Sequence, residues 1–170
     1  MRNHHTEISH FWEFASILRR RPQAIAGIKG SMEYPEIEGT VRFYQTGSGV
    51  LAACEVTGLP SQPQPCRAGI FGFHIHEGER CTGNATDPFA DARMHYNPEN
   101  CAHPYHAGDL PPLFENGGYA FQIVLSDRFT IGEILGKTVI IHSMPDDFTS
   151  QPAGNSGIRI ACGEIVNMMR

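Results

Sequence analysis

After Pro22, apolar and polar residues alternate with the two-residue period of β-strands along much of the chain. Segments rich in glycine, proline, asparagine and aspartate separate these stretches, as in a chain of short strands and turns. The predicted strands cover about residues 24–30, 38–46, 50–58, 68–76, 110–115, 118–125, 136–142 and 157–166. Eight short strands without alternating helices are typical of an antiparallel sandwich or barrel. We therefore expect an all-β fold.

Residues 6–20 differ from the rest because their apolar side chains recur at helical spacing. The repeating positions are Ile8, Phe11, Trp12, Ala15 and Leu18. Pro22 ends the pattern, since proline is poorly tolerated inside a helix. We predict an amphipathic helix that packs on the barrel or on a partner subunit. A helix lying on a membrane surface is the alternative, because Trp12 and the arginines after it would suit one.

A chain of 170 residues has the size of one domain. We therefore assign residues 1–23 to a helical extension and residues 24–170 to a single β-domain. Glycine (18 residues) and proline (12 residues) are plentiful and charged residues make up 18%, which suits a loop-rich β-protein. The net charge of −5 disfavours nucleic acid and anionic membranes as partners. No apolar run approaches the roughly 20 residues of a membrane span.

The first 21 residues lack the order of a secretory signal. The basic residues Arg19, Arg20 and Arg21 follow the apolar stretch at 11–18, whereas a signal peptide begins with its basic residues. We therefore expect the cytoplasm as the compartment. An extracytoplasmic location is the alternative, because the chain has five cysteines and stable disulfides favour oxidising compartments. The odd number leaves at least one thiol unpaired within the chain.

Two long irregular segments, at 77–109 and 143–156, interrupt the strand pattern directly after histidines. Long loops in a compact domain are usually functional. Six of the nine histidines and one aspartate are the candidate metal ligands: His74, His76, His95, His103, His106, Asp109 and His142. If one histidine is shared, seven such residues supply the roughly eight ligand positions that two four-coordinate metal ions require.

The candidate ligands divide into two groups by their predicted elements. His74 and His76 alternate in a strand, so both point to one side while Ile75 faces the core. With His142, which ends another strand, and one histidine from the loop, they form a nitrogen-rich set that suits copper. The absence of methionine and cysteine from this set argues against a blue-copper electron carrier.

The long loop supplies the second group, in which three histidines and one carboxylate suit tetrahedral zinc. These residues are His95, His103, His106 and Asp109. A zinc-only hydrolase is a competing interpretation, but Asp109 is the one carboxylate among the candidate ligands, and such sites generally place more carboxylates near the attacking water. The simplest alternative is a polar surface loop that happens to be rich in histidine.

Five motifs, taken together, resemble those of the copper–zinc superoxide dismutase family, and the resemblance runs from about residue 24 to residue 166. They are GFHIHEGERC (72–81), MHYNP (94–98), HAGDLPPL (106–113), VIIHSMPDD (139–147) and GNSGIRIACGEI (154–165). The resemblance implies a Greek-key β-barrel of immunoglobulin-like topology. It also implies dismutation of superoxide to oxygen and hydrogen peroxide. HAGDLPPL and the cysteine soon after HIHE look more like bacterial than animal members.

The resemblance implies a role for each matching residue. Copper would be bound by His74, His76, His95 and His142, and zinc by His95, His103, His106 and Asp109. His95 would thus be shared by both metals and take part in catalysis. Asp146 would hydrogen-bond to His74 and His103. Arg159 would hold superoxide beside copper, Cys81 and Cys162 would form the family disulfide, and the chain would form a homodimer through an interface that the sequence does not identify.

Three cysteines remain outside that pattern. Cys66 and Cys101 both lie in predicted loops, so they could form a second disulfide, whereas Cys54 lies in a strand and is expected to be a buried free thiol. Sequence alone does not fix the pairing.

The zinc segment is shorter than is usual in the family, because two residues separate His103 from His106. This departure keeps a metal-binding protein without turnover as the alternative function. The segment 143–158 contains neither lysine nor glutamate, and its charged residues are Asp146 and Asp147. Animal members use charges in this segment to steer superoxide. We therefore predict a weaker dependence of the rate on salt than in those enzymes.

Overall fold

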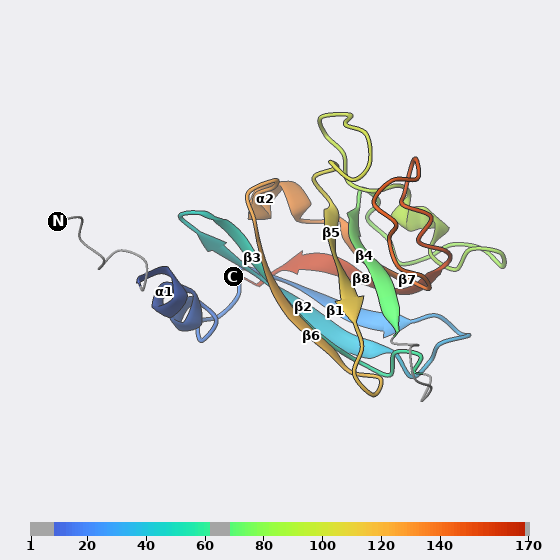
Figure 1. Ribbon diagram of the computed structural model, residues 1–170, viewed down its shortest axis with the longest axis horizontal. Helices are drawn as coiled ribbons and strands as arrows, with labels where there is room; N and C mark the ends of the chain where they lie inside the picture. Colours follow the sequence, from blue (N-terminus) through green and yellow to red (C-terminus); the bar gives the residue numbers. More distant parts are fainter. Residues whose placement is uncertain (1–8, 62–68, 169–170) are drawn as a thin grey trace.

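The strand predictions are confirmed in the structure, a computed structural model that describes residues 9–61 and 69–168 (Figure 1). Each strand lies within two residues of its predicted position, and residue 68 of the fourth prediction lies outside the described residues. The strands are β1 (Ala24–Gly30), β2 (Glu38–Thr46), β3 (Gly49–Thr57), β4 (Ile70–His76), β5 (Asp109–Phe114), β6 (Ala120–Ser126), β7 (Thr138–His142) and β8 (Arg159–Asn167). The alternation pattern did not predict two short helical turns, η1 (Ala90–Ala92) and α2 (Ile131–Ile134).

The strands form one antiparallel sheet in the order β5-β4-β7-β8-β1-β2-β3-β6, which curls into a nearly closed barrel. The chain crosses from one half of this order to the other three times, between β3 and β4, between β5 and β6 and between β6 and β7, as in a Greek key. The predicted turn at Asn116, Gly117 and Gly118 is also present. Both glycines have positive φ there, 63° and 82°, and the turn joins the two edge strands β5 and β6.

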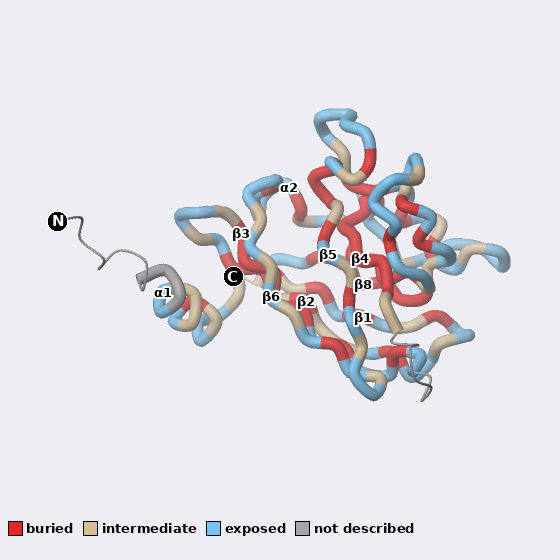
Figure 2. The backbone as a smooth tube through the Cα atoms, in the orientation of Figure 1, coloured by how far each residue is buried: buried red, intermediate tan, exposed pale blue. Residues whose placement is uncertain are grey.

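The barrel interior holds the main hydrophobic core, as the buried stretches of the strands show in Figure 2. Strand β4 contributes Phe71, Phe73 and Ile75 to this core. Because side chains alternate along a strand, His74 and His76 point to the opposite face. They are nevertheless almost completely buried, at 0% and 1% exposure, because the segments 77–108 and 143–158 cover that face. The sheet therefore presents two histidines beneath two long loops.

The N-terminal helix α1 (Ser9–Ile17) packs on the outer face of the barrel. The contact is made by Phe14 and Ile17 of the helix and by Leu18 directly after it, and the partners on β2 and β3 are Tyr44, Leu51 and Ala53. The prediction that this helix packs on the barrel is thus confirmed, although residues 6–8 of the predicted range lie outside the described residues. The predicted contact face is wrong in part, because Trp12 is 65% exposed. In the described part of the chain, no helix combines the length and the apolar character needed to cross a membrane.

Candidate metal centre

The histidines of β4 and β7 meet because the two strands are antiparallel neighbours in the sheet. His74 lies opposite Ile140 and His76 opposite Thr138. His142 is the last residue of β7, and an irregularity in the pairing with β8 falls between Ile141 and His142. The long loop then returns to β4 through an isolated bridge between His76 and His95. Sheet pairing therefore brings together histidines that are far apart in sequence.

Four histidines form what we call the first cluster: His74, His76, His95 and His142. One ring nitrogen of each lies within 4.8 Å of the others, and all four residues are buried. The Nε2 atoms of His76 and His142 are 3.2 Å apart. The first cluster is thus a compact set of nitrogen donors of the kind that copper and zinc prefer.

Hydrogen bonds at the far side of each ring leave one nitrogen facing the first cluster. His76 Nδ1 lies 2.9 Å from the Arg93 carbonyl oxygen, to which it can donate, and this leaves Nε2 free to ligate. His142 Nδ1 faces the Gly157 carbonyl in the same way, at 3.5 Å. His74 uses the other nitrogen, because its Nε2 lies 2.8 Å from Asp146 Oδ2. Such outer hydrogen bonds fix the tautomer of a metal-binding histidine.

The second cluster consists of three histidines and one carboxylate: His95, His103, His106 and Asp109. Asp109 Oδ1 lies 2.7 Å from His95 Nδ1 and 3.3 Å from His106 Nδ1. Asp109 Oδ2 lies 3.1 Å from His103 Nδ1. All four donor atoms therefore converge despite the short stretch between His103 and His106. This donor set suits a tetrahedral zinc ion.

His95 belongs to both clusters. Its Nδ1 atom faces the second cluster, where it lies 2.7 Å from Asp109 and 3.4 Å from His106 Nδ1. Its Nε2 atom is buried and has no hydrogen-bond partner among the described residues. A single imidazole thus offers one nitrogen to each cluster.

Asp146 joins the two clusters from behind. Its Oδ2 accepts from His74 Nε2 at 2.8 Å, and its Oδ1 from His103 Nε2 at 2.9 Å. Burial alone would raise the pKa of Asp146, but these bonds and the N–H of Phe148 hold that pKa below its ordinary value. Gly154 permits the close packing here, since its φ is +65° and a Cβ atom would lie 2.0 Å from Asp146 Oδ1.

Three buried ring nitrogens show that the residues fit metal ions. His74 Nδ1, His95 Nε2 and His103 Nδ1 make no hydrogen bond within the described residues, although buried polar atoms are normally paired. Each points into one of the two clusters, where a metal ion would satisfy it. Burial lowers the pKa of His74 to about 4, and burial together with neighbouring histidines lowers the pKa values of His76 and His142 well below the ordinary value. These rings are therefore neutral near pH 7, as ligation requires.

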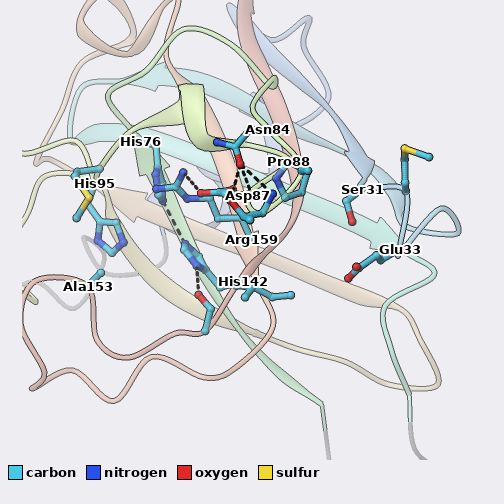
Figure 3. Close-up of a pocket in the computed structure, with 16 residues that line it drawn as sticks. Ser31, Glu33, His76, Asn84, Asp87, Pro88, His95, His142, Ala153 and Arg159 are labelled. Carbon is cyan, nitrogen blue, oxygen red and sulfur yellow. Dashed lines mark hydrogen bonds and ion pairs between the residues drawn. The ribbon is translucent and has the colours of Figure 1, made fainter.

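The first cluster opens to solvent through a cavity of about 610 Å³, drawn in Figure 3. His76, His95 and His142 lie at its base and Arg159 on its wall. Asp109 of the second cluster lines a separate cavity of about 360 Å³, whereas His103 and His106 are buried, at 3% and 6% exposure. A small anion could thus approach three histidines of the first cluster beside the guanidinium of Arg159. In the second cluster, the three histidines do not line the cavity beside Asp109.

The implied disulfide is present, since Cys81 and Cys162 are bonded at an S–S distance of 2.01 Å. It ties the beginning of the long loop to β8. Cys54 is buried as predicted, and burial raises the pKa of its thiol to about 12. Cys101 is exposed and unpaired. Cys66, the other half of the suggested second disulfide, lies outside the described residues.

Several supporting contacts had no recognisable signal in the sequence. The side-chain amide of Gln151 makes two hydrogen bonds with the backbone of His103: Oε1 accepts from the N–H at 3.0 Å, and Nε2 donates to the carbonyl at 2.8 Å. Arg128 donates to the carbonyls of Pro104 and His106, both at 3.3 Å. Each bond crosses between loops, so no local motif would reveal it.

Comparison with known proteins places this geometry in context. Residues 37–165 match the family model of copper/zinc superoxide dismutase. Superoxide dismutase [Cu-Zn] 2 of Aquifex aeolicus is 33% identical over 145 residues, which cover 76% of this chain and 80% of that protein. The superoxide dismutase [Cu-Zn] of Legionella pneumophila is 35% identical over 139 residues, or 77% and 79% of the two chains. The Cu/Zn superoxide dismutase from Brucella abortus has a similar structure, with a TM-score of 0.69 and 27% identity over 83% of this chain and 98% of that one.

Proposed function

The chain belongs to the copper/zinc superoxide dismutase family and is an oxidoreductase that acts on superoxide, and we propose that the two clusters are its copper and zinc sites. The observation that carries this assignment is His95, whose two ring nitrogens face different clusters. A bridging imidazole offers one nitrogen to each metal ion: His95 Nδ1 faces the donors of the second cluster, and His95 Nε2 has no hydrogen-bond partner among the described residues.

The first cluster is proposed to hold copper and the second to hold zinc. Two observations support this assignment of the metals to the clusters. The first cluster offers nitrogen donors only and opens into the cavity, as a redox site for a small substrate requires. The second includes the carboxylate of Asp109 beside three histidines, a donor set that is typical of structural zinc. Copper, when bound, supplies the one-electron redox chemistry by which two superoxide ions become oxygen and hydrogen peroxide.

The chain's own residues supply binding and a place for a proton. Arg159 lines the cavity and offers a permanent positive charge to an anionic substrate. His95 Nε2 is a buried nitrogen at the base of the cavity, so it is suited to hold one of the two protons that hydrogen peroxide requires. Asp146 keeps His74 oriented through the hydrogen bond to Nε2.

The test compares three preparations: wild-type protein with one copper and one zinc, the same protein with zinc alone, and the His95→Ala variant with both metals. We expect superoxide dismutation by the first, none without copper, and a loss of about 100-fold or more in the variant, because general acid–base groups contribute on that order. The absorption spectrum verifies copper loading. A fully loaded but inactive wild-type protein would instead favour a metal-binding protein without turnover, and near-wild-type activity of His95→Ala would refute the bridging role.

Two further expectations stay predictions. The chain is expected to form a homodimer, as the family resemblance implies, and light scattering coupled to size-exclusion chromatography would measure its mass. It is also expected in the cytoplasm, which fractionation of the source cells would test.

A further inference from the structure

We propose that Asp87 is a positioning residue for Arg159, and that its carboxylate also weakens the attraction of this guanidinium for anions. The inference rests on the proposed function, because it concerns how superoxide reaches the first cluster. Asp87 belongs to none of the motifs that the sequence analysis singled out. The structure brings it to the cavity wall beside Arg159, as Figure 3 shows.

Arg159 is held by three acceptors from the long loop. Nη1 donates to Asp87 Oδ2 and to the Phe89 carbonyl, both at 2.9 Å, and Nη2 donates to the Arg93 carbonyl. These bonds use three of the five N–H groups of a guanidinium. Two N–H groups, on Nε and Nη2, have no partner among the described residues. They are the donors that remain for a substrate anion.

Asp87 is itself fixed in place, so the ion pair is not a chance surface contact. Its Oδ1 accepts from the Phe89 N–H at 3.0 Å, which leaves Oδ2 for Arg159. Its own N–H donates to Asn84 Oδ1 at 3.0 Å, and its carbonyl accepts from the Asn84 N–H at 2.9 Å. The side chain of Arg159 is only 15% exposed where the two meet. Asp87 therefore limits the positions that the guanidinium can adopt.

The Arg93 carbonyl links this arrangement to the ligands. It faces Nδ1 of His76 and also accepts from Arg159 Nη2. A shift of Arg159 would consequently disturb the outer hydrogen bond of a histidine in the first cluster. Precise placement of the guanidinium thus matters for the ligand geometry as well as for the substrate.

The charged residues that line the cavity support the proposal that Asp87 weakens the attraction of anions. Apart from the histidines, the described charged residues that line the cavity are Arg159, Asp87 and Glu33. Glu33 is exposed, and its side chain makes no hydrogen bond or ion pair with the described residues. One positive charge therefore faces two negative charges. An anion bonded to the guanidinium would lie about two hydrogen-bond lengths from Asp87, where Coulomb repulsion in partly aqueous surroundings weakens binding by about threefold to tenfold.

The experiment measures azide affinity, with azide as a stable anion in place of superoxide. Wild-type protein loaded with copper and zinc is titrated with azide, and the Cu(II) charge-transfer band is followed. Asp87→Asn removes the charge and keeps an acceptor near Arg159, whereas Asp87→Ala removes both. Asp91→Asn is the matched control, because Asp91 lies in the same loop, bonds to Thr82 and does not line the cavity.

We expect the azide dissociation constant of Asp87→Asn to fall by about threefold to tenfold, with a change of less than about twofold in Asp91→Asn. Asp87→Ala should gain less azide affinity than Asp87→Asn, because only the carbonyls of Phe89 and Arg93 then hold its guanidinium. Equal affinities in Asp87→Asn and Asp91→Asn, or weaker binding in Asp87→Asn, would overturn the charge effect. Equal azide dissociation constants for Asp87→Asn and Asp87→Ala would overturn the positioning role.

Glu33→Gln keeps the proposal testable if a variant at Asp87 does not fold. It removes an exposed charge from the cavity wall, and a smaller gain in azide affinity, about twofold, is expected. No gain would overturn the view that carboxylates on the wall oppose anions. The failure of the proposed function is distinguishable, because wild-type protein would then bind azide without dismutating superoxide.

Discussion

The two clusters are built in different ways. Three ligands of the first cluster, His74, His76 and His142, lie on the neighbouring strands β4 and β7, with core residues such as Phe73 and Ile75 directly behind them. The histidines of the second cluster come from the long loop, and Asp109 stands at the first position of β5. The first cluster is thus carried mainly by the barrel, and the histidines of the second by the irregular part of the long loop that follows η1.

This difference shows what each cluster needs in order to hold its shape. Strand ligands are fixed by the hydrogen bonds of the sheet and by the packed core beneath them. Loop ligands need bonds from elsewhere, and these come from Gln151, Arg128 and Asp146. The stretch between His103 and His106 is shorter than is usual in the family, which could have kept the donors of the second cluster apart. The structure shows that contacts across loops bring the four donors together nevertheless.

The largest expected effect comes from removing the bond that ties the long loop to the barrel. Replacing Cys81 and Cys162 by serine should lower the free energy of unfolding by about 4–5 kcal/mol, because the disulfide closes a loop with a sequence separation of 81. Urea denaturation of the metal-free protein measures it. Cys101→Ser, at an exposed thiol, serves as the control. A loss below about 1 kcal/mol would mean that other contacts already hold the loop.

Asp146→Ala should affect both clusters, because Asp146 bonds to one ligand of each. We expect zinc affinity to fall by about tenfold to 100-fold, as is usual when an outer hydrogen-bond partner of a ligand is lost. Competition with a zinc chelator measures the change. Asp147→Ala is the matched control, since Asp147 bonds with its neighbours Thr149 and Ser150. Equal losses in the two variants would contradict the linking role.

Gln151→Ala should separate the two clusters, because its two hydrogen bonds reach only the backbone of His103. Zinc affinity is expected to fall by about tenfold, near the lower limit for such partners, while copper affinity changes by less than about twofold. Gln45→Ala is a suitable control, since this glutamine also bonds to backbone carbonyls but lies at the β2–β3 turn. A parallel loss of both metals would show that the clusters are not independent.

The smallest expected effect is the dependence of the wild-type rate on salt. Asp146 is buried against His74 and His103, and Asp147 is bonded within its own turn. Both are carboxylates, so neither attracts the superoxide anion. Stopped-flow or pulse-radiolysis measurements should show that the rate of dismutation falls only slowly as the ionic strength rises. The rate of Asp87→Asn should fall more steeply, because the positive charge of Arg159 is then no longer opposed by the carboxylate of Asp87. A steep slope in the wild-type protein would contradict the first expectation, and an unchanged slope in Asp87→Asn would contradict the second.

The sequence by itself determined the strands and the chemistry of the ligands. Alternation is a local property, so it identified the strands and put His74 and His76 on one face. The motif residues pointed to both donor sets, to Asp146 and to the disulfide. The contact face of α1 was predicted less well, because helical periodicity does not show which part of an apolar stripe the barrel will cover.

Only the tertiary structure decided which residues support the ligands. Gln151 lies 48 positions from His103, and Arg159 lies 72 positions from Asp87. Such partners are chosen by how the loops fold over the sheet. The Arg93 carbonyl that faces His76 and accepts from Arg159 is a backbone atom, which every residue type possesses. Residue identity therefore revealed the ligands, whereas the contacts that orient them depend on distances between segments that no local pattern encodes.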